Sequence, residues 1–439
     1  MSRKARWVTA LLLAVIAVAV LTLALTDAPH GPMTEARERA SGFAQTLLQL
    51  AEPQPVSATA ELKPGEVELC DYGRVSLRDD DEMPATVRAD AALALDRAAA
   101  ELMASGIDRN RALGLKLRMA AAVRPIQNRA LQQQPDCLTN ANCAARLDDV
   151  SAIAAAPWVE SMAKLALTTT DANAYGQAFQ ACSKGDSSKR AASCKLLSPD
   201  RWAQLDPHNA APWLYVANAA HERKDAAAVE QAAYKIATSR VSDIRWGSDY
   251  AVMQSHAIAE QPRYTQIAAS VDVVGSSVKS PIPNYQSLTS LCARESMNDD
   301  NRRRLCSDMG EMFVQRDTSL IGFSVGIALG ERAGWDRERI ENLRDEREAL
   351  TSMHAATLGG ERLFSCGWFE KFDAWSRDVA RHGEMGAARA RIKASGRGIS
   401  ELAQDRREQT RQIDAEVNAL DESEGVGKAP LAAPPGGRN

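Results

Sequence analysis

Gly322-Phe323-Ser324-Val325-Gly326 is the segment whose residue types come nearest to a catalytic motif. Gly-x-Ser-x-Gly is the nucleophile elbow of serine hydrolases, and it needs a strand before it, a helix after it and a parallel sheet around it. The surrounding sequence lacks the pattern of such a sheet. Gly322, Gly326 and Gly330 recur every four residues, so we expect a helix face against which a second helix packs closely.

Two charged segments partly match metal sites. His221-Glu222-Arg223-Lys224-Asp225 differs from the zinc motif His-Glu-x-x-His at its last position, so we expect a solvated helix end. Arg78-Asp79-Asp80-Asp81-Glu82 lacks the alternate ligands and glycine turn of a calcium loop, so we expect a solvated loop. The chain shows neither a phosphate loop nor a dinucleotide fingerprint. We therefore expect no catalytic residue, no metal and no cofactor.

The densest aromatic patch lies in the C-terminal third of the chain. Phe364, Trp368, Phe372 and Trp375 step by four, four and three residues, which places them on one helix face. Such a face is typical of a core, and a groove for a partner or ligand is the alternative. The candidate partner-binding residues are Trp368 and Trp375, together with Trp213 and Tyr215 in the middle of the chain.

Eight cysteines form an even set that suggests disulfides in an exported chain. Three local pairs are symmetric about polar turns: Cys137 with Cys143, Cys182 with Cys194, and Cys292 with Cys306. In an antiparallel helical hairpin, residues equidistant from the turn face each other, so each pair could close its turn. Cys70 and Cys366 remain, and would join the start of the domain to its end. Free buried cysteines are the alternative.

An uninterrupted apolar run extends from Trp7 to Thr26, directly after Arg3, Lys4 and Arg6. A helix over this run would be roughly 30 Å long, which matches the hydrocarbon core of a bilayer. Positive charges precede the run and none follows until Arg37, so the rest of the chain should be exported. We expect an uncleaved signal anchor, with a cleaved signal peptide as the alternative.

Composition favours the bacterial cell envelope, because Arg far outnumbers Lys and Ala is abundant. We expect a single-pass inner-membrane protein with its C-terminal domain in the periplasm, or a secreted periplasmic protein. The net charge of −4 and the absence of a long basic stretch argue against a nucleic-acid partner.

The apolar spacing of the exported part predicts an all-α fold of helices joined by short polar turns. The one alternating segment, 66–77, predicts a short β-hairpin. Helices are expected at 34–51, 86–104, 108–133, 157–168, 173–182, 210–223, 226–238, 248–259, 264–274, 285–294, 301–316, 319–332, 336–356, 369–381, 384–394 and 400–420.

This organisation predicts four regions. Residues 1–28 form the anchor or signal peptide, and 29–65 form a juxtamembrane helix and linker. Residues 66–421 form an array of antiparallel helical pairs, an α-solenoid in its overall plan. Residues 422–439 are rich in Gly, Pro and Ala and should be disordered.

One segment, 202–237, resembles a tetratricopeptide repeat. Leu205-Asp206-Pro207, Asn209-Ala210 and Trp213 match the end of one helix, the turn and the start of the next in that family. Ala217 and Ala220 depart from the family's Gly and Tyr, and the second helix is shifted by one residue. With a degenerate preceding copy the similarity would extend over 172–238. The resemblance implies a concave surface that binds a protein.

The sequence therefore favours a non-catalytic scaffold or adaptor that binds a protein partner in the envelope. The alternative is a periplasmic enzyme that acts on envelope material with acid and base residues that the sequence does not single out.

Thiol labelling tests the export argument. If the cysteines are paired as expected, a maleimide should label none of them in the unreduced, denatured protein and all eight after reduction. Extensive labelling before reduction would contradict the export of residues 29–439.

Overall fold

The computed structural model describes residues 62, 66–76, 83–134, 136–137, 140–183, 191–244, 248–254, 258–278, 283–358 and 362–423. This part of the chain is 78% helix and 4% strand, which confirms the all-α class. The expected membrane segment 7–26, the helix 34–51, the acidic run 78–82 and the tail from 424 lie outside the described residues.

The elements follow one another as a hairpin and then a series of helices. They are β1 (Glu66–Leu69), β2 (Gly73–Ser76), α3 (Ala85–Ala104), α4 (Asp108–Gln133), α5 (Ala141–Thr168), α6 (Ala172–Cys182), η2 (Ser193–Leu196), α7 (Pro199–Leu205), α8 (Ala210–Glu222), α9 (Ala226–Ala237), α10 (Ser248–Gln254), α11 (Arg263–Val278), α12 (Gln286–Leu291), η3 (Arg294–Asn298), α13 (Asp300–Arg316), α14 (Leu320–Arg332), α15 (Arg337–Leu358), α16 (Cys366–Ser395) and α17 (Ile399–Ser423). The strands pair antiparallel with Val67 opposite Val75, which confirms the hairpin.

Polar residues in the turns start the helices by capping them. The side chains of Asn140, Asp171, Asp225 and Asp299 each accept hydrogen bonds from backbone N–H groups in the first turn of the following helix. Such caps satisfy donors that have no partner inside the helix.

Several boundaries differ from the sequence prediction: α10 ends at Gln254 rather than at 259, α12 ends at Leu291 rather than at 294, and the start of α5 differs most. Helix α5 begins at Ala141 rather than at Pro157, because Asn140 caps it and Pro157 lies inside the helix. The predicted helices 369–381 and 384–394 are the two halves of α16, which meet at a kink at Gly383, where the backbone is not helical and φ is 70°. Glycine adopts this left-handed conformation without the steric cost of a side chain.

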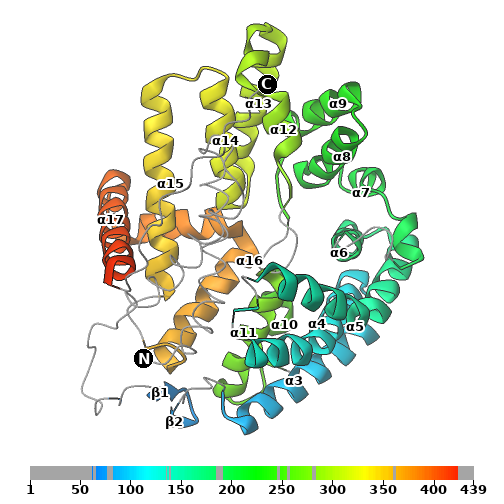
Figure 1. Cartoon of the computed structure of the whole chain (residues 1–439), viewed down its shortest axis with the longest axis vertical. Helices are drawn as coiled ribbons and strands as arrows, with labels where there is room; N and C mark the ends of the chain where they lie inside the picture. Colours follow the sequence, from blue (N-terminus) through cyan, green and yellow to red (C-terminus); the bar gives the residue numbers. More distant parts are fainter. Residues whose placement is uncertain are drawn as a thin grey trace, which may run out of the picture.

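The spatial order of the helices departs from their order in the sequence (Figure 1). Neighbours such as α3 and α4, α8 and α9, and α13 and α14 pack against each other. However, α10 and α11 leave this succession: α10 packs on α16 and α11 on α3, whereas α9 packs directly on α13. Helices from the middle of the chain thus lie between its two ends.

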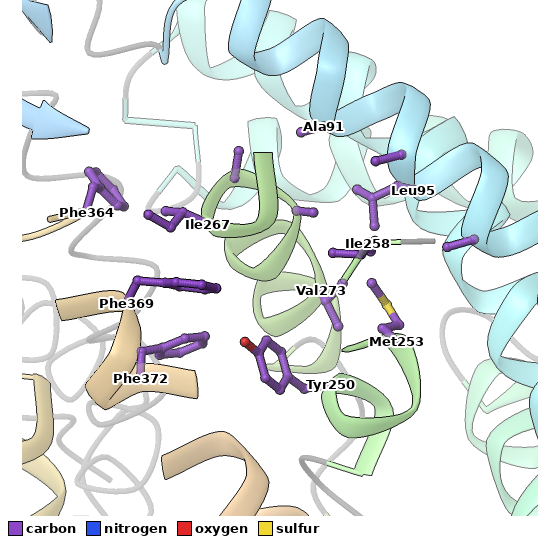
Figure 2. Packing of buried hydrophobic residues seen from close by; sticks show 14 of the residues in the cluster. Ala91, Leu95, Tyr250, Met253, Ile258, Ile267, Val273, Phe364, Phe369 and Phe372 are labelled. Carbon is purple, nitrogen blue, oxygen red and sulfur yellow. The ribbon is translucent and has the colours of Figure 1, made fainter. Parts of the chain in front are cut away.

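The largest hydrophobic core forms around α10 and α11. Figure 2 shows Phe364, Phe369 and Phe372 facing Tyr250 and Ile267, with Ala91 and Leu95 of α3 beyond them. The Trp368 and Phe372 rings stack with their centroids 5.1 Å apart. The aromatic face of α16 therefore belongs to the hydrophobic core, as expected, and does not line a groove for a partner.

All four disulfides have the expected pairing: Cys70–Cys366, Cys137–Cys143, Cys182–Cys194 and Cys292–Cys306. The first joins the β-hairpin to the start of α16 across 296 residues. Beside it, Cys70 N donates to Phe364 O at 3.1 Å, so the backbone reinforces the link between the two ends.

Within the described residues, one helix is long and apolar enough to cross a membrane by length and composition alone. This helix is α5, and 28% of its apolar 18-residue stretch is buried. One such helix is weak evidence, because core helices of soluble proteins pass the same test.

The disulfides should differ in their effect on stability. Chain-entropy arguments give about 6 kcal/mol for a loop as long as that of Cys70–Cys366 and about 2 kcal/mol for the short Cys137–Cys143 loop. We expect C70A/C366A to lower the free energy of unfolding in urea more than C137A/C143A does. Equal losses would contradict a dominant role for the long-range link.

Candidate functional site

Ser324 lies inside helix α14 and not on a strand-to-helix turn. Its hydroxyl donates to Leu320 O at 2.8 Å, one helical turn earlier. A Cβ at Gly326 would approach Gly310 O and Phe313 Cβ to 2.9 Å, so this glycine permits the close contact of α13 and α14. The expectation of helix packing at the glycine repeat is confirmed.

The segment His221–Asp225 gains no support as a metal site. Asp225 Oδ1 accepts from Ala228 N at 3.0 Å and so caps α9. Among the described residues, the one close group of possible ligands is Cys70, Asp71 and Cys366. Its two cysteines share a disulfide, so they offer no thiolate to a metal.

The four candidate partner-binding aromatics do not form one surface. Trp368 and Trp375 are 1% and 6% exposed in the core, so burial leaves them no contact with a partner in this structure. Trp213 is partly buried beside α9, with Lys235 Nζ 6.0 Å from its ring centre. Tyr215 faces the other way and packs on Phe179, and burial raises the pKa of Tyr215 to about 12.

A joint between distant segments lies at the start of α14. We call it the α14 joint, and it comprises Ser242, Asp243, Asp317, Thr318 and Glu384. Ser242 N donates to Arg316 O at 3.0 Å and Thr318 N donates to Ser242 O at 2.9 Å. Thr318 O in turn accepts from Met385 N at 3.1 Å, beside the kink of α16. The joint therefore ties the segment after α9 to both α14 and α16.

Two carboxyl groups of the α14 joint bind the first turn of α14. Asp317 Oδ1 accepts from Ser319 N at 2.7 Å, and Glu384 Oε2 accepts from Leu320 N at 3.0 Å. Burial raises the pKa of each carboxyl to about 7. For Asp317, hydrogen bonds from Ser242 and Ser319 oppose this rise, and the nearby Asp243 adds to it.

Carboxyl groups with a raised pKa can mark an active site, but the burial of Asp317 and Glu384 also has a structural explanation. The N-terminus of a helix attracts acceptors because its first N–H groups lack partners. Gly322 fits the same explanation, since a Cβ there would overlap the Asp317 carboxyl. Neither carboxyl lines the pocket between α4, α6, α7 and α10 or the groove between α9 and α13.

The first cavity is a small polar pocket between α4, α6, α7 and α10. Lys116, Asn173, Gln177, Trp202, Asp206, Asn209, Asp243 and Asp249 line much of it. Lys116 Nζ lies 2.6 Å from Asp249 Oδ2, and both side chains are nearly buried. Its volume of about 30 Å³ suits a single water molecule, so we interpret it as part of the junction between these helices.

The second cavity is an open groove between α9 and α13. We call it the α9–α13 groove, and Tyr234, Ala237, Thr238, Leu305, Asp308, Glu311, Met312, Gln315 and Arg316 line it. It has a volume of about 200 Å³. Buried Met312 and partly buried Ala237 and Leu305 supply an apolar floor, whereas Tyr234 on its wall is 60% exposed.

The rim of the α9–α13 groove carries both charges and amides. Glu311 lies 2.6 Å from Arg339 and accepts from Gln315 at 2.9 Å, so its charge is already paired. Asp308 and Arg316 are exposed to solvent. The disulfide between Cys292 and Cys306, the residue after Leu305, ties the first half of α13 to the end of α12.

No family model, curated protein or solved structure matches this chain. Its fold and its disulfides define the broad class: an all-α protein with four disulfides. A more specific function has to be inferred from its cavities, charges and surfaces.

Sequence reasoning missed both the α14 joint and the groove. The Asp317-Thr318-Ser319 turn before Gly322 signals a capped helix, but nothing in the sequence points from there to Glu384. The groove depends on the packing of α9 against α13. This contact is possible because α10 and α11, which lie between them in the sequence, pack instead on α16 and α3.

Ionisation of Asp317 should make stability depend on pH. Its folded-state pKa of about 7 lies above that of the unfolded chain, so the free energy of unfolding should fall as pH rises from about 4 to about 7. The fall should be on the order of 4 kcal/mol for this residue. D317N should remove the share of Asp317 from the pH dependence in urea titrations at several pH values and leave that of Glu384, whereas E222Q at an exposed helix end should leave the whole dependence unchanged. An unchanged slope in D317N would refute the assignment.

Proposed function

We propose that this protein is a membrane-anchored periplasmic scaffold or adaptor that binds a protein partner in the α9–α13 groove. The observation that carries the proposal is the groove itself, with its apolar floor and the exposed Tyr234 on its wall. Small-molecule sites are commonly about 300–1,000 Å³ and more enclosed. A groove of about 200 Å³ suits one or two side chains of a protein segment better.

The chemistry of the groove indicates the kind of segment that it would take. An apolar side chain would cover Met312 and Leu305, and Tyr234 would pack along it. Exposed Asp308 would favour a neighbouring Lys or Arg of the partner, because Glu311 is already paired with Arg339. We therefore expect an apolar residue flanked by a basic one.

The proposed location rests on two features. The apolar run 7–26 is the anchor that the sequence predicts. Four disulfides, three of them closing local turns, are typical of an oxidising compartment such as the periplasm.

The tetratricopeptide resemblance supports the same class of function. Helix α7 ends at Leu205 and α8 begins at Ala210, with Asn209 capping α8 and donating to Asp206 Oδ2 at 3.0 Å. A helix, a capped turn and a second helix at this spacing fit one unit of such a repeat. We propose the repeat relationship for 202–237, with binding of a protein as its consequence.

An enzyme acting on envelope material is the second candidate. The observation in its favour is the pair of carboxyls with a raised pKa, Asp317 and Glu384. Both carboxyls cap the first turn of α14 and neither lines one of the two cavities, which favours the adaptor.

Crosslinking in the native cells tests the adaptor. The full chain with a C-terminal tag is crosslinked and purified, and the bound proteins are identified by mass spectrometry. Y234A should reduce recovery of the partner about 30-fold, since loss of an aromatic anchor commonly costs about 2 kcal/mol or more. L196A removes a similarly exposed apolar side chain elsewhere and should leave recovery unchanged.

Two results would count against the adaptor. Equal recovery with Y234A and L196A would place the partner away from the groove. Recovery of no protein by a folded, disulfide-bonded chain would favour the enzyme instead.

A further inference from the structure

Helix α5 exposes an apolar face to solvent. One side of α5 packs against α4 and α6. On the other side, Val150 is 49% exposed and Ile153 is 75% exposed, which makes Ile153 the most exposed large apolar side chain among the described residues. Ala152, Ala156 and Pro157 lie beside them and are also exposed. We call these five residues the α5 face.

Apolar side chains gathered on one helix face gain free energy when a partner covers them. The small side chains of Ala152 and Ala156 would let a second helix approach closely to Ile153. The α5 face and the α9–α13 groove share no residue, so they would serve different contacts.

The charges around the α5 face are arranged symmetrically. Arg146 lies seven residues before Ile153, and Glu160 lies seven residues after it. Seven residues are close to two helical turns, so both return to nearly the same face at about 10 Å from Ile153. Arg146 is exposed, and Glu160 is partly exposed.

This symmetry makes the α5 face complementary to itself. When a second copy crosses in the antiparallel direction over Ile153, Arg146 of each copy meets Glu160 of the other. A parallel crossing would instead place the two Arg146 side chains together. Glu160 already accepts from Ser193 Oγ at 2.6 Å and Ser193 N at 3.2 Å, which holds the carboxylate in position. Glu160 Oε1 also lies 3.5 Å from Lys164 Nζ, an exposed side chain. A carboxylate has about four acceptor positions, so one position on Oε2 remains for Arg146 of a second copy.

We propose that the α5 face is a homodimer interface in which α5 of two copies cross in the antiparallel direction about a two-fold axis near Ile153. Such an isologous contact buries the same patch on both copies and closes the assembly at two chains. A bilayer surface is a poorer occupant, because Asp149, four residues before Ile153 and so on the same side of α5, would meet anionic headgroups. In the antiparallel dimer Asp149 lies opposite Pro157 of the second copy and not opposite another carboxylate. The inference does not depend on the adaptor function.

Cysteine crosslinking tests the position of the axis. All eight native cysteines are in disulfides, so I153C adds a single free thiol to the full-length chain. A short bismaleimide should convert purified I153C to a species of twice the mass, because the axis brings the two thiols together. L93C and L196C, at exposed apolar positions on other elements, should stay monomeric under the same treatment.

Charge reversal tests the antiparallel register. R146E and E160R should each lose the dimer in sedimentation velocity. In a dimer of two identical variant chains, residue 146 of one chain and residue 160 of the other would carry the same charge. An equal mixture of the two variants should regain the dimer, because both pairs in the mixed dimer have opposite charges. Circular dichroism of each variant checks that E160R remains folded without its bonds to Ser193.

Several outcomes would overturn the proposal. They are a monomer at micromolar concentrations, equal crosslinking at positions 93, 153 and 196, or no recovery in the mixture of folded R146E and E160R. A monomer that binds anionic vesicles and loses that binding in I153D would assign the α5 face to a membrane instead.

Discussion

The contact between the β-hairpin, near the start of the described chain, and the beginning of α16 governs the rest of the structure. Cys70 and Cys366 are covalently joined, and the aromatic face of α16 packs beside them on α10, α11 and α3. Because α10 and α11 fill the space between the ends, they cannot also separate α9 from α13. The α9–α13 contact, and with it the groove, thus depends on a core far from it in the sequence.

The α14 joint shows how a helical fold accommodates acidic residues in its interior. Asp317 and Glu384 sit where backbone N–H groups would otherwise lack partners, so their burial has a compensating hydrogen bond. The consequence is a pair of carboxyls with a pKa of about 7 that belongs to the framework of the molecule. Raised pKa values alone do not separate a catalytic acid from a cap.

Local signals in the sequence predicted local structure well. Polar turns flanked by cysteines predicted three disulfides, and apolar spacing predicted the starts of α4, α8 and α9. Prediction failed where one residue type occurs in two structural positions. Proline is common at the first position of a helix, but Pro157 lies inside α5. The return of α10 and α11 to the ends of the chain, and hence the groove and the α14 joint, depends on contacts across long separations that no local pattern encodes.

The Cys70–Cys366 bond also determines how tension would travel through the molecule. A force pulling the β-hairpin away from α17 would enter at Cys70, cross to Cys366 and leave through α16, because the covalent link is the shortest connection between them. The covalent path bypasses the elements between the two cysteines, from β2 to α15. A chain tethered near its start and held at its end could thus be stretched while its binding surfaces keep their shape.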